Sequence, residues 1–143
     1  MNRPTVTALV GSWLLLTAAA GLWPDTRVSA AELTLVENGQ PKAVIVLSDT
    51  PSRTAKQAAE VLRDHLAAAS GARLEIHRQK ALGEVTVVDK KVVAPAVPSA
   101  TVFLLVGEGP LAERLGLSSS GLGPGGISIQ TLPNAVALFS PDD

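Results

Sequence analysis

Runs of apolar residues after position 32 predict strands around one long amphipathic helix. Residues 33–36 alternate between apolar and polar side chains and end at the turn signal Asn38-Gly39. Residues 43–47 form a continuous apolar run, which is typical of a strand buried on both faces. The spacer between these two segments is short enough for a hairpin, so we expect them to pair antiparallel.

The clearest element is a helix that begins in the Thr50-Pro51-Ser52 cluster. Either Thr50 or Ser52 can accept the first backbone hydrogen bonds as the N-cap. From Ala55 to Ala69 the apolar residues recur every three or four positions and form one stripe. Gly71 supplies the left-handed residue that ends a helix.

The remaining strands complete a mixed sheet. Residues 73–77 alternate, and a strand–helix–strand unit makes them parallel to the strand at 43–47. The elements expected after them are a central strand (101–106), a short helix (111–115), a loop (118–126) and a terminal hairpin (127–132 and 135–139, joined by Pro133-Asn134). The fold class predicted is α/β (α+β): a mixed β-sheet with one long packed helix and a C-terminal hairpin.

Residues 78–100 are the least regular part of the pattern. Residues 84–88 and 91–93 can form a hairpin that turns at Asp89-Lys90, and the Pro-rich residues 94–98 resemble an extended linker. We therefore expect this whole stretch to be a surface insertion.

The first 31 residues have the pattern of a secretory signal peptide. Arg3 precedes an uncharged, mostly apolar stretch at 8–22, and the small residues Val28-Ser29-Ala30 follow, with cleavage expected after Ala30 or Ala31. The alternative is an uncleaved anchor, but the apolar stretch is shorter than the roughly 20 residues of a membrane-spanning helix. The pattern indicates a secreted or periplasmic protein without a stable membrane anchor.

Composition narrows the classes of function. The chain has 143 residues, 46% of them hydrophobic, and a net charge of −1, which disfavours a nucleic-acid-binding face. It contains no cysteine, which excludes disulfides, thiol catalysis and cysteine-ligated zinc. Both tryptophans, Trp13 and Trp23, lie in the leader, and there is no tyrosine. A carbohydrate-binding module that stacks sugars on aromatic side chains is therefore disfavoured.

Two glycine-rich segments have the composition of phosphate-binding loops. Residues 107–112 fit G-x-G-x-x-A after a buried strand, but the following helix is short and no acidic residue stands about 20 positions later. A tight turn is the favoured interpretation. The glycines at 121, 123, 125 and 126 precede a strand and indicate a flexible loop.

Other candidate chemistry is equally sparse. His65 and His77 lack a third histidine or a zinc-binding spacing, and no G-x-S-x-G sequence supports a serine nucleophile. Asp49, Glu108 and Asp142 fall at or just after strand ends, where catalytic carboxylates often lie, but solvated loop positions explain them as well. We predict no catalytic residue, no cofactor-binding residue, no metal site and no cofactor for this chain.

Several segments together resemble a known family. Val36-Glu37-Asn38-Gly39, a strand, a helix ending in Ser70-Gly71-Ala72, the strand–glycine segment 102–107 and the closing hairpin follow the order seen in the N-terminal domain of secreted bacterial alpha-glucuronidases. The pre-barrel domain of bacterial beta-N-acetylhexosaminidases is also similar. The resemblance covers about residues 33–77 and 101–143, so residues 32–143 are expected to form this domain.

The resemblance implies a non-catalytic accessory role in polysaccharide breakdown. In these families the catalytic carboxylates lie on a following (β/α)8 barrel, which this chain lacks, so the barrel or a carbohydrate is the expected partner and the chain is expected to be a fragment. Two other functions remain open. One is a stand-alone exported binding protein with a site in loops 107–110 and 118–126, and the other is a small autonomous hydrolase.

Overall fold

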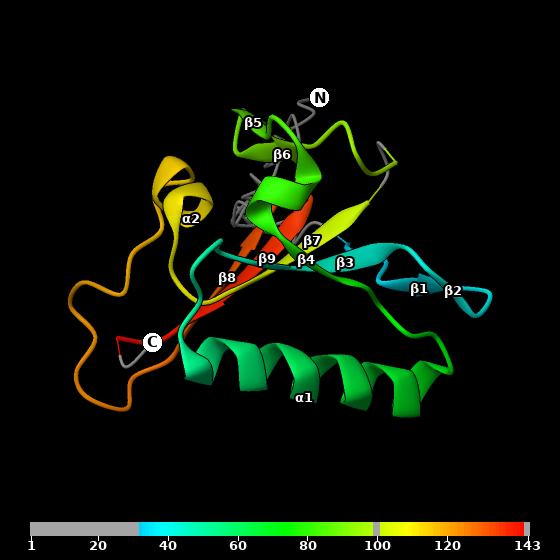
Figure 1. Cartoon of the computed structure of the whole chain (residues 1–143), viewed down its shortest axis with the longest axis horizontal. Coiled ribbons are helices and arrows are strands. Elements are labelled where there is room, and N and C mark those ends of the chain that lie inside the picture. Colours follow the sequence, from blue (N-terminus) through cyan, green and yellow to red (C-terminus); the bar gives the residue numbers. More distant parts are fainter. Residues whose placement is uncertain (1–31, 99–100, 142–143) are drawn as a thin grey trace, which may run out of the picture.

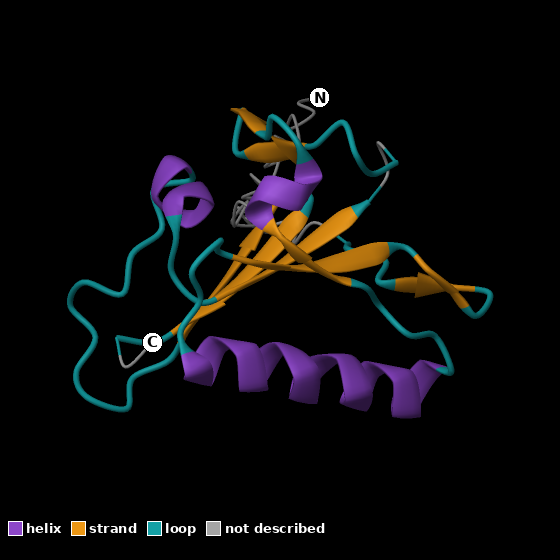
Figure 2. Cartoon of the chain, viewed as in Figure 1, coloured by secondary structure: helices purple, strands orange, loops and turns teal. Residues whose placement is uncertain are grey.

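The computed structural model describes residues 32–98 and 101–141, and the expected signal peptide lies outside them. In chain order the elements are β1 (Val36–Glu37), β2 (Gln40–Pro41), β3 (Ala43–Leu47), α1 (Arg53–Ser70), β4 (Ile76–Arg78), the 3₁₀ helix η1 (Gln79–Leu82), β5 (Thr86–Val88), β6 (Lys91–Val93), β7 (Val102–Val106), α2 (Pro110–Arg114), β8 (Ser128–Leu132) and β9 (Ala135–Phe139). Helix α1 lies on one side of the main sheet, and η1, the β5–β6 hairpin and α2 lie on the other (Figures 1 and 2).

The main sheet has five strands in the order β4-β3-β7-β9-β8. Strands β4, β3, β7 and β9 run parallel, and β8 pairs antiparallel with β9. The central strand β7 is buried along its whole length, as its unbroken apolar sequence predicts. The mixed α+β fold class is therefore confirmed, including the C-terminal hairpin.

Helix α1 forms as the sequence predicts and uses the second of the two possible caps. The Ser52 side chain accepts a hydrogen bond from the Ala55 amide at 2.9 Å, and Gly71 ends the helix with φ of 74°. Ala55 and Ala59 are buried against the sheet because their small side chains allow close approach. The strands on either side of α1, β3 and β4, are parallel as expected.

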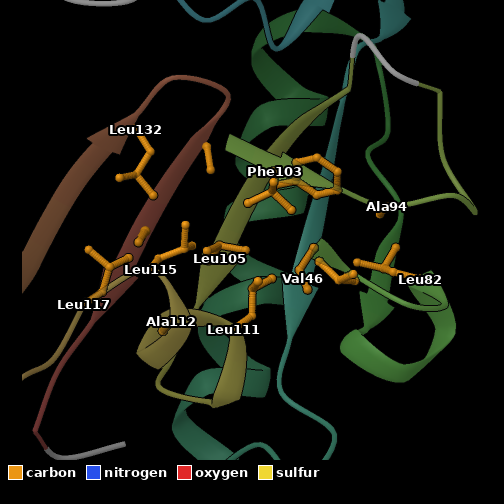
Figure 3. Packing of buried hydrophobic residues seen from close by; sticks show 14 of the residues in the cluster. Val46, Leu82, Ala94, Phe103, Leu105, Leu111, Ala112, Leu115, Leu117 and Leu132 are labelled. Atoms are coloured by element: carbon orange, nitrogen blue, oxygen red, sulfur yellow. The ribbon is translucent and has the colours of Figure 1, made fainter. Parts of the chain in front are cut away.

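Two separate cores sit on the two faces of the sheet. The helix-side core lies under α1 and consists of Ala43, Ile45, Leu47, Ala55, Ala59, Leu74, Val102, Leu104 and Val106. The hairpin-side core lies on the opposite face and consists of Val46, Leu82, Val85, Val92, Ala94, Phe103, Leu105, Leu111, Ala112, Leu115, Leu117, Leu132, Ala135, Ala137 and Phe139 (Figure 3). Adjacent strand residues alternate between these cores, because successive side chains of a strand point to opposite faces.

The hairpin-side core corrects the expectation for residues 78–100. The hairpin itself forms as predicted, turning through Asp89 and Lys90, which both have positive φ. Its surroundings are not those of a surface insertion, because Leu82 and Val92 are 0% and 2% exposed and pack beside Phe103. This segment supplies the second layer over the sheet that a largely parallel sheet needs.

The N-terminal pairing also differs from the expectation. The hairpin joins β1 to β2 through Asn38 and Gly39, with φ of 51° and 73°, and β3 pairs instead with β4 and β7. Strand β3 is buried on both faces, so parallel partners on both sides satisfy its backbone groups better than one hairpin could.

Candidate functional site

Strands β3, β4 and β7 run parallel, so their carboxyl ends lie together at one end of the strands. This end is the usual place for a ligand site in a parallel sheet. Asp49 and Glu108 both lie here, just after β3 and β7. Asp142, the third candidate carboxylate, lies outside the described residues. The carboxyl ends of these strands are therefore the candidate site.

Asp49 links the end of strand β3 to the end of strand β4 and to η1. Its Oδ1 accepts a hydrogen bond from the Lys80 amide at 2.8 Å, and its backbone oxygen accepts one from Arg78 Nη1 at 3.1 Å. The same guanidinium nitrogen is 3.5 Å from the backbone oxygen of Ser48. These contacts tie the end of β4 and the start of η1 to the end of β3, which is a structural role.

Glu108 ties down the loop at 118–126. Its Oε1 accepts a hydrogen bond from the Ser119 amide at 2.8 Å. Hydrogen bonds from the Ser119 side chain and backbone lower the pKa of Glu108 from its ordinary value of 4.5. A carboxylate with a lowered pKa stays ionised, so it is poorly suited to act as a general acid.

The space between these loops is filled. Gln79 Oε1 accepts a hydrogen bond from the Leu111 amide at 3.2 Å, so a side chain already occupies the start of α2. The cavity enclosed by β3, β7 and α2 measures only about 20 Å³, too small for a ligand. The space between the turn at 107–110, the end of β3 and Gln79 is therefore closed to a ligand.

The G-x-G-x-x-A motif has a packing explanation. Gly107 has φ of 79°, as the tight turn after a buried strand requires, and α2 has only five residues. A Cβ atom on Gly109 would lie 2.7 Å from Cβ of Ser48, so only glycine lets the turn approach β3 this closely. The glycines serve backbone packing, as the tight-turn interpretation predicts.

The second glycine cluster forms turns of its own. The Gly126 amide donates to the Gly123 oxygen at 2.9 Å, and Gly121 and Gly125 have positive φ. The segment leads into β8 and not into a helix, so its amides are not aligned as they are at a helix N-terminus.

The two histidines lie in different environments and far from a common ligand set. His65 Nδ1 is 2.8 Å from the Val61 oxygen on α1, and His77 Nε2 is 2.9 Å from Glu75 Oε2 beside β4. Within residues 32–98 and 101–141, no three His, Cys, Asp or Glu side chains cluster as a metal site would require.

One buried polar side chain escaped the sequence reasoning. Asn134, expected only as a turn residue, is 8% exposed, and its Oδ1 accepts from the Val92 amide at 2.8 Å while its Nδ2 donates to the Val92 oxygen at 2.7 Å. The amide thus replaces a missing strand partner for β6 and fastens the β5–β6 hairpin to the sheet. A sequence pattern does not reveal this contact because the two residues are 42 positions apart.

An apolar groove also lies beside this hairpin. It has a volume of about 710 Å³ and is lined mainly by Val88, Val93, Pro95, Val97, Phe103 and Pro133. The polar lining groups are few, with Asp89 and Lys91 at the turn. The groove adjoins residues that the structure does not describe, and it offers shape without an arrangement of reactive groups.

The most prominent surface feature is an incompletely covered sheet face. Helix α1 packs mainly on β3, β4 and β7. Arg63 lines a depression beside β4, which puts the opposite flank of α1 toward β9 and β8. Val61 lies about 200° around the helix from the buried Ala59, so it points away from the sheet and not along this flank. Val61 is 56% exposed. The side of the sheet beyond this flank has no helix over it among the described elements.

The side chains on this uncovered part are apolar. Val136 and Leu138 of β9 are half-buried at the margin of the helix-side core. Ile129 is opposite Leu138 in the register, so it lies on the same face, and it is 66% exposed. We call Ile129, Val136 and Leu138 the open face.

The chain was compared with protein-family models, with curated proteins and with solved structures. None of them matches it. In the described residues, no helix has both the length and the apolar character needed to cross a bilayer.

Proposed function

We propose that this chain is a non-catalytic accessory domain of a secreted glycoside hydrolase of the alpha-glucuronidase type. It acts by packing its open face against the catalytic (β/α)8 barrel of that enzyme. The sequence resemblance suggests this family, and the mixed sheet with one long helix and a C-terminal hairpin has the architecture that the resemblance implies. Export follows from the signal-peptide pattern of residues 1–31.

The open face is the observation that carries the proposal. A largely parallel sheet is normally covered on both faces, because its strands present apolar side chains to each side. Here α1 covers one part of its face and leaves Ile129 66% exposed beside half-buried Val136 and Leu138. Apolar side chains gathered in this way mark a surface that another domain covers.

The state of the candidate carboxylates supports a role without catalysis. Asp49 and Glu108 each accept hydrogen bonds from backbone amides, and the cavity between their loops measures about 20 Å³. A glycosidase needs two carboxyl groups about 5–10 Å apart across an open cleft that holds a sugar. The same filled space beside residues 107–110 does not favour the alternative, a stand-alone exported binding protein with a site in loops 107–110 and 118–126.

The first test measures exposure of the open face. The purified chain should enhance the fluorescence of the dye ANS, and Ile129→Lys should weaken the enhancement while the far-UV circular dichroism stays unchanged. Gln130→Lys, also exposed and next to Ile129 on β8 but on the opposite face of the sheet, is the matched control and should leave dye binding as it is. A chain that binds no dye would contradict an uncovered apolar surface.

The second test asks for catalysis directly. The purified chain is incubated with aryl glucuronides and other aryl glycosides, and no turnover above background is expected. Hydrolysis by the isolated chain that disappears in Glu108→Ala would refute the proposal, because that carboxylate would then act in the reaction.

A further inference from the structure

Strand β8 (Ser128–Leu132) forms one edge of the main sheet and pairs only with β9 among the described elements. Backbone oxygens of Asn134 and Leu138 accept hydrogen bonds from β7, so the alternate residues Ala135, Ala137 and Phe139 turn their backbone groups toward β8. Their register partners on β8 are Leu132, Gln130 and Ser128. The alternation of an antiparallel pair then directs the backbone N–H and C=O groups of Ile129 and Thr131 away from the sheet.

The two edges of the sheet differ in charge. Beside the opposite edge, β4, lie Glu75, His77 and Arg78, side chains of the kind that protect an edge from pairing. Around β8 the whole segment 115–140 contains no charged residue. Within it, Ile129 is 66% exposed on the edge strand. The edge therefore lacks the usual devices that prevent another strand from adding to it.

We propose that β8 pairs with β8 of a second copy of this chain, antiparallel, around a two-fold axis at Gln130. In this register Ile129 lies opposite Thr131 of the second copy, and the outward backbone groups of both copies meet in four hydrogen bonds. The two Gln130 side chains face each other across the axis. The two five-stranded sheets then continue as one sheet.

A second copy fits this edge better than an unrelated strand for a reason of symmetry. A two-fold axis places each edge against itself, so a charge at the axis would meet its own copy directly and charges beside the axis would meet nearby copies of the same sign, which is destabilising. An edge without charges meets this condition. The pairing uses both β8 edges and leaves only the charged β4 edges free, so the assembly closes at two chains.

This inference goes beyond the proposed function and is independent of it. Gln130 pairs with Ala137, which belongs to the hairpin-side core, so its side chain points away from the open face. A substitution at Gln130 changes the edge and leaves Val136 and Leu138 untouched. Failure of the dimer would leave the packing of the open face unaffected, and the reverse also holds.

Sedimentation of the full chain gives the first test. Over protein concentrations from about 1 µM to 1 mM, the range in which a small interface is populated, the mass should rise to that of two chains. In Gln130→Lys two ammonium groups meet on the axis, and the mass should stay at that of one chain. A wild-type monomer at the highest concentration, a larger polymer, or a dimer insensitive to Gln130→Lys would each overturn the proposal.

A cysteine cross-link tests the register and does not depend on the affinity. The chain has no cysteine, so Gln130→Cys places one thiol per copy. The pair on the axis is expected to have its Cα atoms about 4.5 Å apart, which suits a disulfide. Oxidised glutathione should convert this variant to a covalent dimer at least about tenfold faster than it converts Glu75→Cys beside β4. The reason is that only the thiols at position 130 are held next to each other in the dimer. Equal rates would overturn the pairing of β8.

Discussion

The contact between Asn134 and Val92 makes a sharp prediction about stability. The Asn134 amide accepts from and donates to the Val92 backbone at 2.8 and 2.7 Å, and Val92 is 2% exposed. Asn134→Ala removes both partners and leaves a buried N–H and a buried C=O unpaired. Each of the two unpaired groups costs about 1–3 kcal/mol, so we expect a loss of about 2–6 kcal/mol in the free energy of unfolding.

This loss is large for a domain of this size. It corresponds to a fall of roughly 10 °C or more in the melting temperature. The measurement is urea and thermal unfolding followed by far-UV circular dichroism, because the described residues contain no tryptophan whose fluorescence could be followed. Gln130→Ala, an exposed change on the same hairpin, is the matched control and should stay within about 0.5 kcal/mol. An Asn134→Ala variant as stable as that control would refute the reasoning.

A second variant separates the hydrogen bonds from the packing. Asn134→Asp keeps the shape but turns a carboxylate oxygen toward the Val92 carbonyl, so the variant should be at least as unstable as Asn134→Ala at neutral pH. Protonation restores an O–H donor, and burial raises the pKa of such a carboxyl group. Stability should therefore recover as the pH falls, whereas a purely steric effect would not depend on pH.

Three further predictions concern the turn after β7, the hairpin-side core and the contact between Glu108 and the loop at 118–126. Gly109→Ala places a Cβ 2.7 Å from Cβ of Ser48 and should destabilise the domain by about 1–3 kcal/mol in urea unfolding. Leu82→Ala opens a cavity at a residue that is 0% exposed and should cost about 2–5 kcal/mol. Hydrogen bonds from Ser119 lower the pKa of Glu108, so its contribution to stability is present above its ordinary pKa of 4.5 and is lost as pH falls through the lowered value. Glu108→Gln should therefore make the urea midpoint change less between about pH 7 and about pH 3.

Each of these predictions has a control in the same part of the chain. Gly123→Ala adds a Cβ with nothing within 4 Å and should be nearly neutral, unlike Gly109→Ala. Val88→Ala removes a side chain that is 58% exposed from the same hairpin layer and should cost far less than Leu82→Ala. A Leu82→Ala loss no larger than that of Val88→Ala would contradict the assignment of this segment to the core. An unchanged acid sensitivity in Glu108→Gln would show that the Ser119 contact does not stabilise the loop.

The local elements of the fold follow from sequence patterns because they depend on neighbouring residues. The stripe of apolar residues from Ala55 onward, the cap at Ser52 and the left-handed Gly71 define α1, and each acts within a few positions along the chain. The unbroken apolar run of β7 marks it as central for the same reason, since a strand covered on both faces needs no polar positions. The absence of a cysteine likewise excludes whole classes of chemistry without any structure.

Features that join distant residues could be decided only by the tertiary structure. Residues 78–100 have the pattern of a Pro-interrupted surface insertion, yet Leu82 and Val92 are buried because the sheet has a second apolar face that this segment covers together with α2. Asn134 fastens β6 to the sheet only because the fold brings Val92, 42 positions earlier in the chain, next to its side chain. Asp49 and Glu108 lie at strand ends, as predicted, but their backbone partners and the side chain of Gln79 fill the space that a site would need. Patterns report which residues avoid water, whereas the meeting of two particular groups depends on how the whole chain packs.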